Sequence, residues 1–469
     1  MDDGSSTRNS APALSTEWVG REIAVVGLAR SGRAVALVLA RAGSEVYASD
    51  SGHSQALDRV AAELRGEGVH VDIGRHDLDR IARASLVVAS PGVPPNAPPL
   101  AAARAAGAAV VSEVEIALRF LPELRYIGIT GTNGKTTTTA LASHLLNAMG
   151  RRAAAAGNIG QPLSDVALSR TPPEWVALEL SSYQLHDTPG VDPRVGVITN
   201  LSPNHLDRYT DVAAYYGDKA LLLRNAAAKS QWVTNGDDPA VQSMVRGVPG
   251  LHCRFSLRGS ADAWLDRESG YLVALGQRLV HRDELQLVGD HNVGNALAAA
   301  LAVLIADPAH READAITALA AGLRTFRPLE HRIEPVADGG GVRWINDSKS
   351  TNVASSLVAL AGMRRPTVVL LGGRHKGEAY TPLADELRRT ARAVIAFGEA
   401  GPLIEHDLGG VVPVVRLGSS FEDVIDRARQ LARPGDVILL SPACSSFDMF
   451  TDYEHRGREF TRLARAKTT

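Results

Sequence analysis

A glycine-rich segment with a single lysine, TGTNGKTT at residues 130–137, is the part of the sequence best suited to chemistry. An apolar run precedes it and an amphipathic segment follows it. This strand, turn and helix predict a phosphate-binding loop, because backbone N–H groups can close around phosphate oxygens at a helix N-terminus. In such a loop Lys135 reaches the β- and γ-phosphates, and Thr136 holds a magnesium ion. Although Ile129 replaces the first glycine of the strict motif, the segment predicts binding of a nucleoside triphosphate.

Polar residues also stand at or just beyond two apolar runs of the same segment. Glu179 lies near the end of one run, and its apolar neighbours favour a ligand of Mg²⁺ over a surface carboxylate. His205, in NLSPNHLDRY, follows the next run, and its position fits a metal ligand and a structural histidine equally well. Lys219 lies in a predicted helix over 213–225, where periodicity alone favours a solvated lysine.

Three polar loops follow three apolar runs in the last third of the chain, at 346–352, 372–376 and 441–448. In an open parallel sheet, ligands bind outside the carboxyl ends of the strands, so the three loops predict a second binding site. Upstream, Asn292 and Asn295 are three residues apart and share a face near the start of a predicted helix. They could contact a base, although helix capping would also explain one of them.

Strand-length apolar runs alternate with helical stretches along the chain, which predicts an α/β protein built on parallel sheets. We expect a Rossmann-like N-terminal domain (21–122), a central P-loop ATPase-type domain (123–328) and a Rossmann-like C-terminal domain (329–469). The small, polar residues 1–20 predict a disordered tail. Strands are predicted over 22–27, 45–50, 85–90, 126–129, 175–180, 194–199, 231–234, 342–345, 367–371, 393–397 and 436–440.

Other segments give less regular patterns. Short alternating runs between about 250 and 288 predict a small antiparallel insertion. The alanine-rich run 101–109 predicts a solvent-facing helix. Further helices are predicted over 34–42 and 293–305.

The first predicted strand ends in a turn that resembles a dinucleotide fingerprint, GLARSG at residues 27–32, with Asp50 about 20 residues further on. The middle glycine, which lets the backbone approach a pyrophosphate, is replaced by Ala29, and this weakens the case for NAD. Another phosphorylated nucleotide ligand, held by backbone N–H groups and Ser31, is favoured. A purely structural turn stays possible.

The composition restricts the class of protein. The 469 residues are 45% hydrophobic with a formal net charge of −2, which gives no electrostatic argument for nucleic acid or a membrane surface. The two cysteines cannot build a disulfide framework, and no apolar run approaches the roughly 20 residues that span a bilayer. We therefore expect a cytoplasmic protein. Its oligomeric state is not fixed by the sequence, and a monomer is favoured.

Taken in order, the motifs resemble those of the Mur ligases, which add amino acids to the cell-wall precursor, over residues 21 to 460. The subset ELSSYQL, LDRY and SPACSSFDMF is similar to the members that add D-glutamate. The motifs are GITGTNGKTTT (128–138), ELSSYQL (179–185), NLSPNHLDRY (200–209), GDHNVGNALAA (289–299), HR (331–332), NDSKSTN (346–352), LLGGRHKG (370–377) and SPACSSFDMF (441–450).

The resemblance implies ATP-dependent amide formation during the synthesis of peptidoglycan precursors. The carboxylate of UDP-N-acetylmuramoyl-L-alanine attacks the γ-phosphate of ATP, and the amine of D-glutamate then attacks the resulting acyl phosphate. Two Mg²⁺ ions are implied, one on Thr136 and Glu179, the other on His205 and on a carbamate carried by Lys219. Because both substrates are anionic, cations must neutralise their charge before the reacting atoms can meet.

The resemblance also implies roles for individual residues, with Lys135, His205, Lys219 and Lys349 as the catalytic group. Lys376 is expected to pair with a carboxylate or with the acyl phosphate. ATP contacts are implied for Gly131, Thr132, Asn133, Gly134, Lys135, Thr136, Thr137, Asn292, Asn295, Arg332 and Asp347. UDP-substrate contacts are implied for Ser31, Asp50, Ser51, Ser90, Gly92, Gly157 and Asn158, and D-glutamate contacts for Lys349, Thr351, Lys376, Ser446, Phe447 and Tyr453.

Other functions fit parts of the pattern. A Mur ligase for another amino acid, or a folylpolyglutamate-type synthase, would share the chemistry, although a folate enzyme does not need the turn at Gly27. An NTP-driven switch would leave the loops of the third segment unexplained. A dehydrogenase is disfavoured by Ala29.

Overall fold

The computed structural model describes residues 20–203, 209–327 and 330–466. The predicted tail, apart from Gly20, and the candidate metal ligand His205 lie outside these residues. The chain divides into two compact units. The first unit comprises the chain up to Leu285 together with Gly294–Thr325, and the second comprises Gln286–Val293 and the chain from Phe326 onward.

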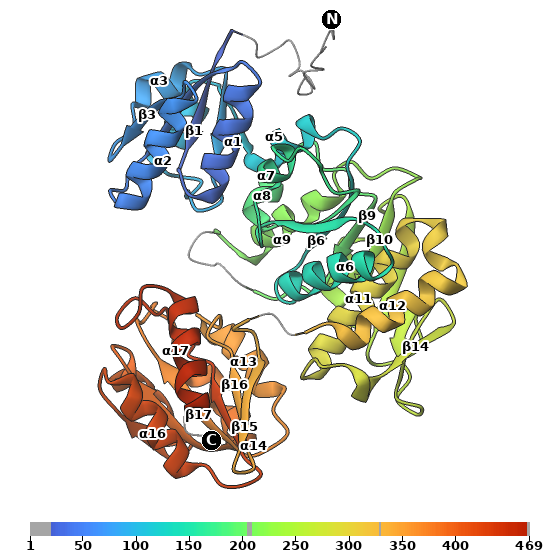
Figure 1. The fold of residues 1–469 in the computed structure, drawn as a ribbon, viewed down its shortest axis with the longest axis vertical. Helices are drawn as coiled ribbons and strands as arrows, with labels where there is room; N and C mark the ends of the chain where they lie inside the picture. The colour runs from blue at the N-terminus through green and yellow to red at the C-terminus, as the bar shows by residue number, and fades with distance from the viewer. Residues whose placement is uncertain (1–19, 204–208, 328–329, 467–469) are drawn as a thin grey trace, which may run out of the picture. The chain divides into compact units, whose positions relative to one another are not determined.

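The N-terminal part of the first unit is a five-stranded parallel sheet with the order β3-β2-β1-β4-β5, shown in blue in Figure 1. Strand β1 lies in the middle, and its apolar sequence EIAVV is buried because helices cover both faces. The strands are β1 Glu22–Val26, β2 Glu45–Asp50, β3 His70–Ile73, β4 Leu86–Ala89 and β5 Ala109–Ser112, and the helices are α1 Arg30–Arg41, α2 Gln55–Gly66, α3 Leu78–Arg83 and α4 Pro98–Ala105.

The second sheet has nine strands in the order β14-β13-β12-β11-β10-β9-β6-β8-β7. Strand β6 lies between β9 and β8, all parallel, so the residues that follow these three strands meet at one edge. The strands are β6 Arg125–Thr130, β7 Ala153–Gly157, β8 Trp175–Glu179, β9 Val195–Ile198, β10 Gln231–Asn235, β11 Leu251–Ser256, β12 Ala263–Leu265, β13 Tyr271–Ala274 and β14 Gln277–His281. The helices are α5 Glu113–Phe120, α6 Lys135–Ala148, α7 Leu163–Ala167, α8 Ser182–His186, α9 Val212–Ala220, α10 Pro239–Met244, α11 Asp290–Ala306 and α12 Ala313–Thr325, with 3₁₀ turns at Leu221–Leu223, Arg282–Glu284 and Pro308–Arg311.

The second unit contains a six-stranded sheet with the order β15-β16-β20-β17-β18-β19 (Figure 1, orange to red). The last strand, β20, pairs in parallel with both β16 and β17, which places the ends of these three strands side by side. The strands are β15 Glu334–Gly339, β16 Val342–Asn346, β17 Thr367–Gly372, β18 Ala391–Phe397, β19 Val414–Arg416 and β20 Val437–Leu440. The helices are α13 Val353–Ala361, α14 Ala384–Thr390, α15 Gly401–Leu408, α16 Phe421–Leu431 and α17 Tyr453–Arg465, with a 3₁₀ turn at Thr381–Leu383.

The predicted α/β class with three parallel-sheet domains is confirmed, and all the predicted strands are present with ends that differ by one or two residues. The domain boundaries at 122 and 328 stay predictions. No helix among the described residues is both long and apolar enough to cross a membrane.

Three predicted segments need correction. The antiparallel part of the region 250–288 is limited to β12–β14, because β12 pairs antiparallel with β13 and β13 with β14, whereas β11 and β12 continue the large sheet in parallel. Helix α9 ends at Ala220 and not at Asn225, whose side-chain amide instead binds the carbonyls of Pro189 and Val191. The alanine-rich run is helical only to Ala105, because Gly107 turns with φ +79°.

Candidate active site

The phosphate-binding loop joins β6 to α6, as predicted. Gly134 caps the helix with φ +80°, and a Cβ at this position would lie 2.2 Å from Oδ1 of Asn295, so only glycine fits. The candidate nucleotide contact Asn295 therefore packs directly against the loop. Asn292, on the same helix, donates from its side-chain amide to the carbonyl of Val288 at 2.8 Å.

The segment after β9 fixes the shape of the loop. Asn200 accepts from the backbone N–H of Asn133 at 2.9 Å and donates to its carbonyl at 3.0 Å. The hydroxyl of Thr199 donates to the same carbonyl at 2.6 Å. Thr132 donates through its N–H to the carbonyl of Asn200 and through its hydroxyl to that of Ser202. The segment Thr199–Ser202 therefore fixes the conformation of the loop without a bound ligand.

Two lysine amines converge on one backbone carbonyl of the loop. Nζ of Lys135 lies 2.9 Å from the carbonyl oxygen of Gly131, and Nζ of Lys219 lies 2.7 Å from the same oxygen. Lys219 is 1% exposed, so the expectation of a solvated helix lysine is wrong. Burial, reinforced by the charge of Lys135, holds the pKa of Lys219 well below its ordinary value, although Glu179 and Asp218 act in the opposite direction.

Glu179 closes strand β8 and is 2% exposed. Its Oε1 accepts from the side-chain amide of Asn158 at 2.9 Å, and its Oε2 is buried without a hydrogen-bond partner. A buried carboxylate oxygen without a hydrogen-bond partner is suited to a bound cation.

The described residues fit one magnesium ion on Thr136 and Glu179, a hydroxyl and a carboxylate of the oxygen-ligand type that Mg²⁺ prefers. No cluster of three His, Cys, Asp or Glu side chains suited to a metal occurs among the described residues.

In the N-terminal sheet, the candidate UDP contacts surround the turn after β1. Asp50 accepts two backbone N–H groups, from Leu28 at 2.7 Å and from Gly52 at 2.8 Å, so its carboxylate shapes the turn. The hydroxyl of Ser90 donates to the carbonyl of Gly27 at 2.7 Å. Ser31 lies in the first turn of α1, while Ser51 and Gly92 are exposed in the loops that follow β2 and β4.

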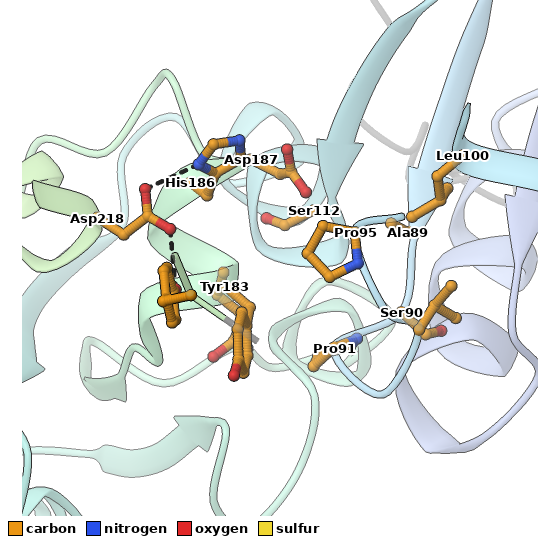
Figure 2. A pocket seen from close by; sticks show the side chains of 13 residues that line it. Ala89, Ser90, Pro91, Pro95, Leu100, Ser112, Tyr183, His186, Asp187 and Asp218 are labelled. Carbon is orange, nitrogen blue, oxygen red and sulfur yellow. Dashed lines mark hydrogen bonds and ion pairs between the residues drawn. The ribbon is translucent and has the colours of Figure 1, made fainter. Parts of the chain in front are cut away.

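A cavity of about 160 Å³ lies within the first unit, between the residues after β4 and helices α8 and α9 (Figure 2). Ser90 and Pro91 line one side and Tyr183 the other, with its ring stacked on that of Tyr209 at 5.7 Å. Asp218 bridges His186 and Tyr209 through hydrogen bonds of 2.8 and 2.9 Å. This hydrogen bond to Asp218 raises the pKa of His186. The cavity therefore combines an aromatic wall with hydrogen-bonding side chains.

In the second unit, the three predicted loops meet at the carboxyl ends of β16, β20 and β17. Asp347, after β16, accepts from the hydroxyls of Ser350 at 2.5 Å and Ser441 at 2.7 Å, which joins the first loop to the third. Burial raises the pKa of Asp347 to about 6. The backbone of Arg374 donates to the carbonyl of Ser445 at 2.9 Å, which joins the second loop to the third.

The candidate amino-acid contacts lie along these loops. Nζ of Lys349 lies 5.5 Å from the ring centroid of Tyr453, and Thr351 donates through its backbone N–H to the carbonyl of Lys349. Ser446 is buried, whereas its neighbour Phe447 is 62% exposed. Lys376 is exposed in the second loop.

Comparison with known proteins agrees with this geometry. Three family models match: Mur ligase MurD-like, N-terminal domain (21–112), Mur ligase middle domain (129–303) and Mur ligase, glutamate ligase domain (331–444). The UDP-N-acetylmuramoylalanine–D-glutamate ligase of Anaeromyxobacter dehalogenans is 42% identical, covering 96% of this chain and 98% of that protein. The enzyme of the same name from Myxococcus xanthus is 40% identical, with 95% and 98% covered. The chain belongs to the Mur ligase family.

Solved structures agree on the fold of this Mur ligase. UDP-N-acetylmuramate-alanine ligase from Thermotoga maritima matches with a TM-score of 0.60 at 20% identity, covering 94% of this chain and 98% of that one. A pseudomurein peptide ligase type C from Methanothermus fervidus gives a TM-score of 0.57 at 22% identity, with 90% and 96% covered.

Backbone strain marks the second unit's site. Four non-glycine residues of the described chain have positive φ, and three of them, His331, Ile333 and Ala443, lie beside candidate site residues. His331 and Ile333 flank the candidate ATP contact Arg332, and Ala443 lies in the third loop. Such conformations cost about 1–3 kcal/mol each and persist where function requires them.

Arg456, on α17, is a residue of this site that the sequence did not reveal. It is completely buried, and it donates to the hydroxyl and carbonyl of Ser348 at 3.0 and 2.9 Å and to the carbonyl of Cys444 at 3.2 Å. Its Nη1 also reaches the carbonyls of Gly372 and Ser445, both at 3.4 Å. One guanidinium thus holds all three loops, and burial lowers its pKa to about 10.

Replacement of Arg456 by lysine is expected to lower the free energy of unfolding by about 1–3 kcal/mol, because an ammonium cannot satisfy carbonyls on three loops. The measurement is denaturant unfolding of both variants. Arg458→Lys, two residues along the same helix with an exposed side chain, is the control and should change the stability by less than about 0.5 kcal/mol. Equal losses in the two variants would refute the role assigned to Arg456.

Proposed function

We propose that this Mur ligase joins D-glutamate to UDP-N-acetylmuramoyl-L-alanine at the expense of ATP, as a step in peptidoglycan precursor synthesis. The observation that carries the proposal is the arrangement of Lys135, Lys219 and Glu179 around the phosphate-binding loop. The full-length likeness to enzymes named for this reaction selects the two substrates. The predicted substrate residues of the two units support the same assignment.

The reaction proceeds in two steps. A carboxylate oxygen of the alanyl group bonds to the γ-phosphorus of ATP, and ADP leaves with the electrons of the broken P–O bond. The amine of D-glutamate then attacks the acyl carbonyl, loses a proton, and expels inorganic phosphate from the tetrahedral intermediate. Three anionic groups meet in this sequence, so the barrier depends on charge neutralisation.

The residues of the phosphate-binding loop supply that neutralisation. Lys135 moves from the loop carbonyls to the β- and γ-phosphates, while backbone N–H groups at the N-terminus of α6 hold the phosphate oxygens. Thr136 and Glu179 would hold Mg²⁺, and the ion would supply charge neutralisation at the phosphates. His205 and a carbamate on Lys219 are the proposed ligands of a second ion.

The cavity shown in Figure 2 is assigned to the sugar-bearing part of the UDP substrate. Its stacked tyrosines, Tyr183 and Tyr209, offer an apolar face to a sugar ring, and the His186–Asp218 pair can bond hydroxyl groups. Gly157 and Asn158, with the turn after β1, are proposed to hold the diphosphate and uridine. In the second unit, Lys349 and Lys376 offer ammonium groups to the carboxylates of D-glutamate.

The deciding experiment measures phosphate release from ATP with UDP-N-acetylmuramoyl-L-alanine and one amino acid at a time. Release is expected with D-glutamate and not with L-glutamate, L-lysine or diaminopimelate. Release with another amino acid would keep the mechanism and move the enzyme to a neighbouring step. No release with any of them would overturn the proposal.

Replacement of Lys135 by alanine is expected to reduce kcat by about a thousandfold or more, since each 1.36 kcal/mol of lost transition-state stabilisation is a factor of ten. Turnover is followed by phosphate release. Lys229→Ala, an exposed lysine of the same unit, serves as the control and should match the wild type. Near-normal turnover of the Lys135 variant would remove the loop from the mechanism.

Replacement of Lys349 by alanine is expected to raise KM for D-glutamate about 10- to 100-fold, because a charged hydrogen bond contributes about 1.5–3 kcal/mol. KM for ATP should stay within about twofold of the wild type. Initial rates over a range of each substrate separate the two constants. An unchanged KM for D-glutamate would place the amino-acid pocket elsewhere.

Carbamylation of Lys219 is expected because CO₂ reacts with an uncharged amine, and burial, which lowers the pKa of Lys219, favours the uncharged form. Protein in isotope-labelled bicarbonate should give a carbamate carbonyl signal by NMR that disappears in Lys219→Arg. Lys229→Arg should retain the signal. A wild-type protein that is active without any such signal would exclude the modification.

A further inference from the structure

Three charged residues from three different elements hold the segment that joins β7 to α7, residues 158–164. At its start, the side chain of Asn158 donates to Glu179 at 2.9 Å. In the middle, Arg30, at the start of α1, donates to the carbonyl of Gly160 at 3.0 Å. At its end, Glu113, the first residue of α5, accepts from the backbone N–H of Ser164 at 2.5 Å. The segment therefore connects the N-terminal sheet to the candidate magnesium ligand.

The contact made by Glu113 is the least expected of the three. Its side chain is 1% exposed, and no ion pair of Glu113 is found among the described residues. Neither its Oε2 nor the buried hydroxyl of Ser164 makes a hydrogen bond of good geometry, although this hydroxyl interacts with the carboxyl group and opposes the rise of its pKa. Burial raises the pKa of Glu113 to about 7. A carboxyl group buried at such cost, where an apolar residue would pack without penalty, calls for a role beyond packing.

Two residues next to Glu113 bind the segment that follows α8. Ser112, the last residue of β5, shares a hydrogen bond of 2.6 Å with the hydroxyl of Thr188. Glu115 accepts from the backbone N–H of Gly190 at 2.7 Å. The start of α5 therefore binds the turn after α8 on one side and the start of α7 on the other. Helices α1, α5 and α7 also contact one another.

We infer that Glu113 is a positioning residue for the UDP substrate. By fixing the start of α7, it sets the conformation of the loop that carries Gly157 and Asn158, the proposed diphosphate contacts. Asn158 also donates to Glu179. The contact between Glu113 and Ser164 therefore fixes the position of the proposed diphosphate contacts relative to the proposed magnesium ligand. The inference rests on the proposed function, and it adds a residue that touches neither substrate nor metal.

Substitutions at position 113 can separate the effect of the hydrogen-bond acceptor from the effect of the negative charge. Glutamine at position 113 keeps a carbonyl oxygen for the N–H of Ser164, and its amide offers a donor to the Ser164 hydroxyl. Alanine removes the acceptor and leaves the N–H of Ser164 buried and unsatisfied. If Glu113 acts through this hydrogen bond, the glutamine variant should behave like the wild type and the alanine variant should not.

The test compares Glu113→Ala, Glu113→Gln and the control Glu123→Ala, an exposed glutamate between α5 and β6. Glu113→Ala should raise KM for UDP-N-acetylmuramoyl-L-alanine at least about tenfold, with KM for ATP and D-glutamate within about twofold. Glu113→Gln and Glu123→Ala should stay within about threefold for all three substrates. An unchanged KM for the UDP substrate in Glu113→Ala, or an equal rise for all three substrates, would overturn the inference.

Hydrogen exchange of the amides of residues 157–164 supplies a readout that does not depend on turnover. Exchange should be faster in Glu113→Ala than in the wild type and unchanged in Glu113→Gln. Should the alanine variant fail to fold, Glu113→Asp, which keeps the charge and withdraws the acceptor by one methylene, must show the same faster exchange. Unaltered exchange would refute the positioning role even for an enzyme with a different substrate, whereas inactivity of the wild type would refute only the proposed function.

Discussion

The carbonyl oxygen of Gly131 accepts hydrogen bonds from two lysine amines, and the rest of the first site depends on this convergence. Two cations at one point repel each other, so the arrangement is stable only if one loses its charge or an anion joins them. Burial of Lys219 favours the first solution, and the carboxylate of Glu179 contributes to the second. A triphosphate would complete the neutralisation, which is why the loop is best understood as a site built for its ligand.

The site in the second unit also contains buried charges, here the cation Arg456 and the carboxyl group of Asp347. Arg456 is fully buried, and its hydrogen bonds go to a hydroxyl and to backbone carbonyls and not to a carboxylate. Asp347 acts on Arg456 only through its field, while its own oxygens bind two serine hydroxyls. Arg456 and Asp347 therefore each hold loop residues through hydrogen bonds, and they do not form an ion pair with each other in the described residues.

Much of this could be predicted from the sequence, because polar residues after apolar runs reveal where parallel strands end. The order of strands β16, β20 and β17 made three loops neighbours, as the sequence suggested. The burial of Lys219 could not be predicted from periodicity, since α9 packs its polar side against the loop. Arg456 lies in a helix rich in arginine, where pattern alone does not separate the buried one from its exposed neighbours. Glu113 resembles an ordinary acidic residue in the first turn of a helix.

The comparison of two buried glutamates shows what identifies a cation site. Glu179 and Glu113 each have one oxygen bound to a neighbour and one buried without a partner. Glu179 ends strand β8, which pairs with the strand that leads into the phosphate-binding loop, whereas Glu113 faces the start of α7 and its pKa rises to about 7 because of burial. A carboxyl group in that second environment can satisfy itself by keeping its proton. The unpartnered oxygen of Glu179 therefore lies where the proposed magnesium ion would need a ligand, next to the phosphate-binding loop, whereas Glu113 is placed to anchor the start of α7.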